Sequence, residues 1–303
     1  MTSRASVDIS RSKQVTATTK GGKLYVVGTP IGNLGDITFR AVDTLKQVDL
    51  IACEDTRRTK KLLDYYRIST PTISYHEHNE MTRAPELILR LEEGNRISLV
   101  SDAGMPIVSD PGYRLIKLAI RHGFAVVPVP GPSAFAAALS AAGLPIDHFH
   151  FAGFLPPKGV ARQRALRKLR EIPGTQVFYE APHRLLEMLE DIGKILGDRP
   201  MVLAREVTKI HEEFLRGTAG ELASRLAMKS IKGEITVLVG GHDPASDSPV
   251  QAPSTVSICD EIDRLKKDRS LDDRGALKVL ARARGISKSE AYRQWQAEKG
   301  LQD

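Results

Sequence analysis

The sequence predicts an α/β protein built from two domains of that class, and three observations support this prediction. Short apolar runs typical of buried strands alternate with stretches of helical spacing between residues 23 and 239. The alternation starts again after the turn signals at residues 142–145. With 303 residues, the chain is also longer than one hydrophobic core usually supports. We therefore expect mainly parallel sheets that are covered by helices.

Each element follows from a local pattern. Apolar runs predict strands, and amphipathic spacing that ends near a glycine predicts helices. The expected strands are 23–28, 49–53, 72–75, 96–100, 124–129, 149–154, 176–179, 201–205 and 235–239. The expected helices are 37–47, 84–93, 112–122, 132–142, 161–171, 183–196 and 218–228.

Composition shifts divide the chain further. The expected parts are a polar tail (1–22), an N-terminal α/β domain (23–142), a C-terminal α/β domain (143–243), a Pro/Ser-rich linker (244–258) and a helical module (259–303). Two helices are expected in the module, broken at residues 285–287. Ser287 would cap the second of these helices, with Glu290 completing a capping box.

Bulk composition narrows the class of protein. No apolar run approaches the length of a membrane span, and the N-terminus lacks the apolar core of a secretory signal. The two cysteines, Cys53 and Cys259, form neither a disulfide framework nor a metal-ligand pattern, so we expect a reducing, cytoplasmic compartment. The net charge of +7 is compatible with an RNA partner, although many cytosolic proteins carry such a charge by chance.

Two turn-rich loops follow predicted strands, where α/β sheets bind ligands. The loop 28–36 (GTPIGNLGD) matches no phosphate-binding motif, and a structural turn and a ligand loop are equally good interpretations. The loop 101–112 (SDAGMPIVSDPG) contains two Ser-Asp pairs. We expect Asp102 to face a ligand, and Ser109 and Asp110 to cap the following helix.

Acidic and basic residues also gather where strands end. The stretch CEDTRR at 53–58 is either an acid–base site or a helix N-terminus with favourably placed acids. In the stretch FYEAPHR at 178–184, an aromatic, an acid and bases leave a strand together, which favours function. The two histidines and one acid at 76–78 are better explained by a solvated loop than by a metal site.

Positive charge concentrates in two helical stretches. Residues 158–170 contain no acid until Glu171, and residues 274–288 are again basic without acids. A solvated face is the usual explanation of such a run. The lack of compensating acids makes a surface that contacts phosphate more probable than average.

Taken together, these segments resemble one family. The motifs, in chain order, are YVVGTPIGNLGDIT, CEDTR, SDAGMPIVSDPG, VPVPGPSA, FAGFLPPKG, FYEAPHR, AREVTKIHEE and GEITVLVGG. They are similar to the ribosomal RNA small subunit methyltransferase I family, whose members are ribose 2'-O-methyltransferases of the tetrapyrrole-methylase superfamily. Each motif alone is weak, but their shared order between residues 23 and 241 is specific.

The resemblance implies two α/β domains of the tetrapyrrole-methylase type, with S-adenosylmethionine in the cleft between them, and a homodimer. It implies that the substrate is a cytidine ribose in the decoding region of small-subunit ribosomal RNA, either in free RNA or in the assembled subunit. The implied reaction requires no metal. The implied cofactor-binding residues are Pro30, Ile31, Ser101, Asp102, Ala103, Gly104, Pro106, Ser133, Ala134, Tyr179, Glu180, Val207 and Ile235.

The chemistry requires a base and a surface for RNA. Glu54 is the first candidate for the general base, because related enzymes carry an acid at the matching strand end, and Asp55 and Glu180 are the reserves. The candidate RNA-binding residues are Arg57, Arg58, Lys158, Arg162 and Arg184, together with the helical module. Two alternatives stay open: a methylase of the same superfamily that acts on a porphyrin-like ring, and an RNA-binding protein without enzymatic activity.

Overall fold

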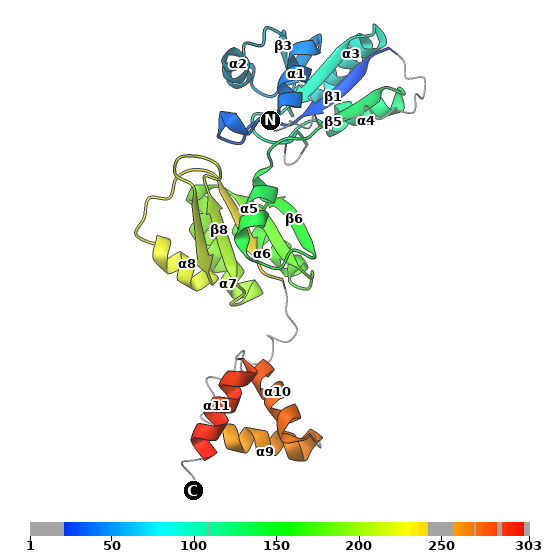
Figure 1. Cartoon of the computed structure of the whole chain (residues 1–303). Coiled ribbons are helices and arrows are strands. Elements are labelled where there is room, and N and C mark those ends of the chain that lie inside the picture. Colours follow the sequence, from blue (N-terminus) through cyan, green and yellow to red (C-terminus); the bar gives the residue numbers. More distant parts are fainter. Residues whose placement is uncertain (1–20, 108–109, 242–256, 270, 284–286, 300–303) are drawn as a thin grey trace, which may run out of the picture. The chain divides into compact units, whose positions relative to one another are not determined.

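The computed structural model describes residues 21–107, 110–241, 257–269, 271–283 and 287–299 (Figure 1). The chain divides into two compact units, residues 1–242 and 243–303. Most of the predicted tail and most of the predicted linker lie outside the described residues. Among the helices that the structure describes, none is both long and apolar enough to cross a lipid bilayer.

The first sheet of the larger unit is wholly parallel, as the sequence predicts, with the order β3-β2-β4-β1-β5. Its strands are β1 (Lys23–Val27), β2 (Leu50–Cys53), β3 (Thr72–Ser74), β4 (Arg96–Val100) and β5 (Ala125–Val129). Its helices are α1 (Phe39–Gln47), α2 (Thr56–Tyr65), α3 (Glu80–Glu92) and α4 (Tyr113–Arg121), with the short 3-10 helix η1 (Leu34–Asp36). Because every strand runs in the same direction, all five carboxyl ends lie at one edge, where such sheets bind ligands.

The second sheet differs from the predicted arrangement. Its order is β6-β7-β10-β8-β9, and only β6 and β7 pair in parallel. The strands are β6 (Phe149–Phe154), β7 (Thr175–Glu180), β8 (Met201–Arg205), β9 (Glu213–Gly217) and β10 (Ile235–Val239). The prediction of a mainly parallel sheet is wrong here because the edge strand β9, EFLRG, has too weak an apolar pattern to be recognised. It turns the chain back along β8 as a hairpin.

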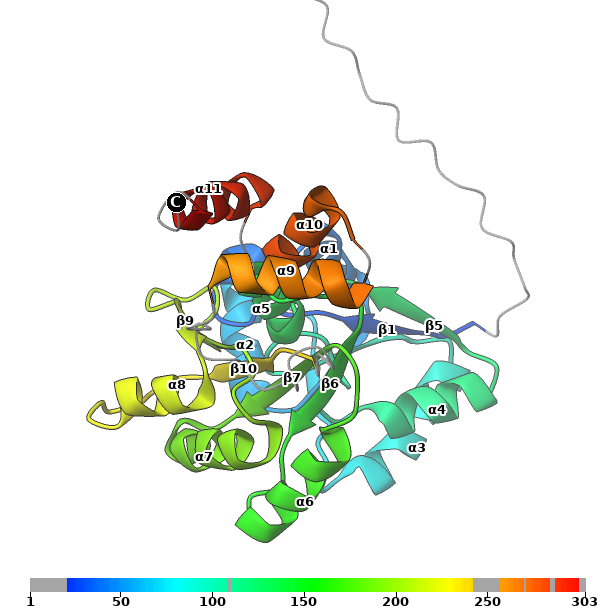
Figure 2. The same cartoon turned by 90° about the horizontal axis from the view of Figure 1, so that it is seen from below.

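Helices cover both faces of the second sheet. The helices α6 (Gly159–Leu169), α7 (Leu185–Leu196) and α8 (Ala219–Leu226) share one core with Phe178 and Val237, and η2 (Pro182–Arg184) precedes α7. Figure 2 shows α7 between α6 and α8. On the opposite face, α5 (Ala134–Ala142) buries Ala138 and Leu139 against β7, β8 and β10 (Figure 1). The predicted domain boundary at residue 142 places α5 in the first domain, but this helix packs on the second sheet.

Helix α4 begins differently from the prediction. It starts at Tyr113 after Gly112, whose φ of 140° suits glycine, and no side chain caps it. The prediction that Asp110 caps this helix is therefore wrong, and Ser109 lies outside the described residues. Asp110 is free to take part in another site.

The smaller unit contains α9 (Ile258–Arg269), α10 (Asp273–Ala283) and α11 (Lys288–Lys299). Two helices were expected, but the described residues form three, because the charged sequence of α9 hides the apolar positions Ile258 and Ile262. These side chains pack with Leu280 and Trp295 in a core of the unit's own. The Ser287 hydroxyl accepts a hydrogen bond from the Glu290 amide at 3.1 Å, which confirms Ser287 as the cap of α11.

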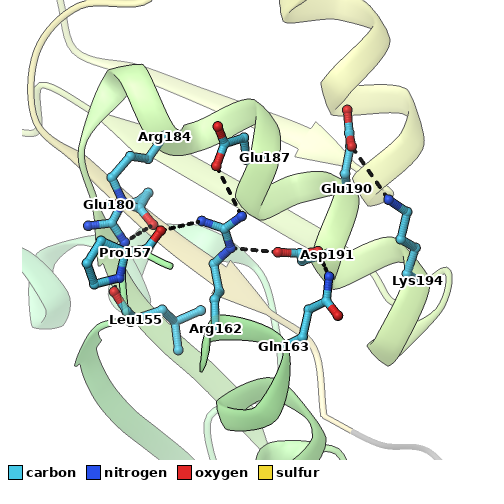
Figure 3. Close-up of polar contacts among 10 residues, drawn as sticks. All are labelled: Leu155, Pro157, Arg162, Gln163, Glu180, Arg184, Glu187, Glu190, Asp191 and Lys194. Atoms are coloured by element: carbon cyan, nitrogen blue, oxygen red, sulfur yellow. Dashed lines mark hydrogen bonds and ion pairs between the residues drawn. The ribbon is translucent and has the colours of Figure 1, made fainter. Parts of the chain in front are cut away.

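An ion pair buried between α6 and α7 contradicts one predicted role (Figure 3). The Arg162 side chain is only 3% exposed, and its Nε donates to Asp191 at 2.7 Å, while another guanidinium nitrogen lies 3.2 Å from Glu187. Its burial makes the predicted RNA contact of Arg162 wrong. Helix α6 lacks acids of its own, but α7 supplies them.

We predict that Arg162→Ala lowers the free energy of unfolding by about 3–5 kcal/mol, because it leaves the buried Asp191 carboxylate without its cation. Urea unfolding followed by circular dichroism measures this loss. Arg164→Ala, on the exposed face of the same helix, is the matched control and should cost about 0.5 kcal/mol or less. Equal effects of the two substitutions would contradict the prediction.

Candidate active site

A cavity of about 380 Å³ opens at the carboxyl-terminal edge of the first sheet and extends to the second, within the size range of small-molecule sites. Both sheets contribute to its wall. The first half of the chain contributes Ile31, Ala103, Gly104, Met105, Asp110, Ser133 and Ala134. The second half contributes Phe154, Tyr179, Glu180, Ala181, Pro182, Ala204, Val207, Gly233, Glu234, Ile235 and Thr236.

Glycines allow the loops at this edge to touch. A Cβ on Gly28 would lie 2.7 Å from the Gly131 Cα. The backbone segments that follow β1 and β5 can therefore contact each other only because both residues are glycines. The amides of Thr29 and Gly104 exchange hydrogen bonds of 2.9 and 3.1 Å with each other's carbonyls. The loop 28–36 forms a turn and also brings Ile31 to the wall of the cavity.

The structure brings most of the predicted cofactor residues together. Nine line the cavity: Ile31, Ala103, Gly104, Ser133, Ala134, Tyr179, Glu180, Val207 and Ile235. Pro30, Ser101, Asp102 and Pro106 are not among the lining residues. The buried Ser101 hydroxyl instead donates to the Gly104 carbonyl at 3.1 Å, which holds the loop that carries the lining residues.

Sequence reasoning missed several residues of the wall, of which Asp110, Phe154 and Glu234 carry the most distinctive chemistry. Asp110 was missed because an acid followed by Pro111 and Gly112 at the start of a helix is typical of a helix cap. Phe154 and Glu234 lie in the motifs FAGFLPPKG and GEITVLVGG, which did signal this region.

Two carboxyl groups beside the ends of β2 and β4 have a raised pKa. Burial, and after it the nearby carboxylates of Glu54 and Asp102, raise the pKa of Asp110 to about 6. The pKa of Glu54 is raised as well, first by burial and then by Asp102. Among the described residues, no hydrogen bond or ion pair engages the Glu54 side chain.

Asp102 has partners on α2 and in the turn that precedes it. Its carboxylate accepts from the Asp55 amide and from the Arg58 guanidinium, each at 3.1 Å. This arrangement joins the end of β4 to the start of α2. The guanidinium of Arg58 nevertheless stays largely exposed.

Asp55 occupies the cap position of α2, as one of the two interpretations of CEDTRR proposed. It accepts from the Arg57 amide at 2.9 Å and from the Arg57 guanidinium, and these contacts lower its pKa to about 2. A carboxylate with so low a pKa is a weak base. Arg57 itself remains 88% exposed and accessible to a partner.

Glu180 and Arg184 form an ion pair at the end of β7 (Figure 3). The Glu180 carboxylate is buried, lies 3.1 Å from the Arg184 Nε and accepts from the Ala181 amide at 2.8 Å. Arg184 also donates to the Leu155 carbonyl at 2.7 Å. Both side chains are therefore engaged within the fold, whereas Lys158, the residue before α6, is exposed.

The comparisons with known proteins agree with this geometry. The family model for Tetrapyrrole (Corrin/Porphyrin) Methylases matches residues 23–223. A relative from Halalkalibacterium halodurans, named ribosomal RNA small subunit methyltransferase I, is 45% identical over 271 residues, which cover 89% of this chain and 93% of the relative. A Thermotoga maritima relative of the same name is 50% identical and is covered over 100% of its length, against 73% of this chain.

The chain belongs to the ribosomal RNA small subunit methyltransferase I family. This confirms the resemblance that the sequence motifs indicated, and the tetrapyrrole-methylase fold with it. The crystal structure of uroporphyrin-III-C-methyltransferase from Thermus thermophilus shares the fold, with a TM-score of 0.54 and 21% identity over 73% of this chain and 94% of that one. A conserved hypothetical protein from Aeropyrum pernix gives a TM-score of 0.57 at 18% identity, covering 73% of this chain and 85% of that one.

We predict that the stability cost of Asp110 depends on pH. Its pKa is about 6 in the folded chain against an ordinary value of 3.8, so the folded state binds more protons between these values and loses stability as pH rises through them. Asp110→Asn should therefore stabilise the protein at pH 7, by at most about 3 kcal/mol, and much less at pH 4.

Thermal unfolding of both proteins at pH 4 and pH 7 measures this difference. Asp43→Asn, on the exposed side of α1, is the matched control and should show no such change. A difference for Asp110→Asn that is equal at the two pH values would contradict the prediction.

Proposed function

We propose that this protein transfers a methyl group from S-adenosylmethionine to the ribose 2'-hydroxyl of a cytidine in the decoding region of small-subunit ribosomal RNA. The observation that carries the proposal is the acid-lined cavity at the strand ends, in a chain whose curated relatives are named for this class of RNA. The free RNA or the assembled small subunit is the partner. We further propose that the protein acts as a homodimer in the cytoplasm.

The residues of the cavity fit S-adenosylmethionine. When bound, this molecule supplies a methyl group on a positively charged sulfonium, and it also carries an ammonium group. Two lining residues, Asp110 and Glu234, carry carboxyl groups that match these positive charges, and Glu234 also pairs with Lys209 at 3.1 Å. Apolar side chains such as Ile31, Val207 and Ile235 suit the adenosine portion. The predicted residues Pro30, Ser101, Asp102 and Pro106 would act by holding the loops that form the wall.

Glu54 is the proposed general base. A ribose hydroxyl is a weak nucleophile, and a base that takes its proton as the new C–O bond forms adds about 10²–10⁴-fold to the rate. Glu54 lies close enough to Asp110 in the cavity wall to raise the pKa of Asp110. Its own raised pKa brings it nearer to the working pH than Asp55, and its side chain is not engaged as that of Glu180 is.

We predict that Glu54→Gln lowers kcat by roughly 10²–10⁴-fold and leaves the affinity for S-adenosylmethionine within about threefold of the original. In the unmodified protein, the rate should rise with pH through the raised pKa of Glu54, because only the ionised carboxylate accepts a proton. That rise should disappear in Glu54→Gln.

Single-turnover methylation across pH, together with calorimetric titration of the cofactor, makes the measurement. Asp55→Asn is the comparison, and its main effect should be on the stability of α2. Unchanged turnover in Glu54→Gln would remove Glu54 as the base.

The proposed RNA surface begins next to the cavity. Arg57 and Arg58 keep exposed guanidinium groups at the start of α2, and Lys158 is exposed before α6. On α6 and at the residue after it, four cations are exposed and form no ion pair with an acid among the described residues: Arg164, Arg167, Lys168 and Arg170. Such groups bind phosphates without regard to sequence. This surface favours RNA over a porphyrin-like substrate.

Incubation with S-adenosylmethionine labelled in its methyl group and with small ribosomal subunits that lack the modification tests the proposal. The label should appear as a ribose 2'-O-methyl group on one cytidine. Label on a small tetrapyrrole, on an RNA base or nowhere would contradict the proposal.

The same assay tests the helical module as an RNA-docking part. Because the module has a core of its own, a chain that ends at Gly241 should keep cofactor binding. We expect it to show at least a tenfold higher KM for the ribosomal substrate. Equal KM values for the two chains would exclude a role in docking.

A further inference from the structure

An irregularity in strand β6 decides the direction of one aromatic side chain. Phe151 pairs with Val177 of β7, but the next pairs are Gly153 with Phe178 and Phe154 with Tyr179. Ala152 is therefore an extra residue, which makes a β-bulge, and Gly153 adopts a φ of 63°. Without this bulge, Phe154 would stand opposite Glu180 instead of Tyr179.

The bulge moves Phe154 from the core face of the sheet to the cavity face. Side chains on a strand alternate between the two faces, and Phe178 is fully buried in the core under α6, α7 and α8. Tyr179, one residue further, lines the cavity. Phe154 shares the side of Tyr179, with ring centroids 5.6 Å apart, and also lines the cavity.

Phe154 is 56% exposed, although a large aromatic side chain favours burial. A bulge that turns a phenylalanine away from the core face of the sheet loses much of the stability that burial of the ring would contribute. Bulges that re-aim a side chain occur preferentially beside active sites. The exposed ring is therefore better explained by a ligand than by packing.

The chain after Phe154 is held firmly (Figure 3). Arg184, paired with Glu180, donates to the Leu155 carbonyl at 2.7 Å, and the buried Arg162 donates to the Pro157 carbonyl at 3.5 Å. These two arginines, which the sequence assigned to RNA, act here as positioning residues for the loop. The loop then leads directly into Lys158 and the exposed cations of α6.

We propose that Phe154 is the stacking platform for the base of the nucleotide that is methylated. This inference rests on the proposed function and names the contact that would hold the target base. Sequence-specific RNA recognition unstacks a base and places it on an aromatic ring, and every base offers a face for stacking. An exposed ring in the cavity wall, followed along the chain by the exposed Lys158 and the cations of α6, suits a base with its phosphates alongside.

Four variants test the platform, with KM for unmodified small ribosomal subunits and Kd for S-adenosylmethionine as readouts. Phe154→Ala should raise KM at least about fivefold and leave the cofactor Kd within about twofold. Phe154→Leu, which keeps apolar area but has no aromatic face, should behave like Phe154→Ala, and Phe154→Tyr should restore the original KM. Phe149→Ala is the control, because Phe149 is also exposed on β6 but does not line the cavity.

Each other outcome has a definite meaning. If Phe154→Ala weakens the cofactor instead of the RNA, the ring contacts the adenine, and the proposal is overturned. If Phe154→Leu keeps the original KM, stacking is excluded. The proposed function fails separately, when the unmodified protein does not methylate the RNA at all.

Discussion

The contact between two glycines at the edge of the first sheet is the constraint on which the site depends. Gly28 follows β1 and Gly131 follows β5, and a Cβ on either one would lie less than 3 Å from backbone of the other. Because they touch, the loop after β1 reaches the loop after β4 through Thr29 and Gly104, and the chain leaves β5 directly for α5. This helix packs on the second sheet, so the same contact brings both sheets to one cavity.

Acidic and basic groups of the larger unit gather in different places. Acidic groups collect in and beside the cavity, where burial and neighbouring carboxylates raise the pKa of Asp110 and of Glu54, and where Asp102 pairs with Arg58. Cations collect outside it, on the exposed side of α6. Under the proposed function, the acidic groups attract a cationic cofactor and the exposed cations attract a polyanionic substrate. The net charge of the whole chain, +7, does not show this separation of acidic and basic groups.

Much of the fold could be predicted because local patterns carry it. The apolar runs of β1, β4, β8 and β10 and the amphipathic spacing of α7 lie within a residue or two of the expected positions. The sequence predictions were wrong where contacts with distant segments of the chain determine the structure. The polar edge strand β9 depends on its pairing with β8, and the charged helix α9 depends on contacts with α10 and α11. Arg162 looked like a surface cation because its acids lie on α7.

By itself, the sequence determined the alternation of strands and helices, the loops at the strand ends that form the site, and the family to which the motifs belong. These features are local, since periodicity, turn residues and motif order need no partner from elsewhere in the chain. Only the tertiary structure decided which side chains face the cavity. In the structure, Asp110 lines the cavity instead of capping a helix, and Arg162 is buried. A bulge places Phe154 on the cavity side of the second sheet. The physical reason is that side-chain direction and charge balance depend on strand register and on neighbours far away in the chain.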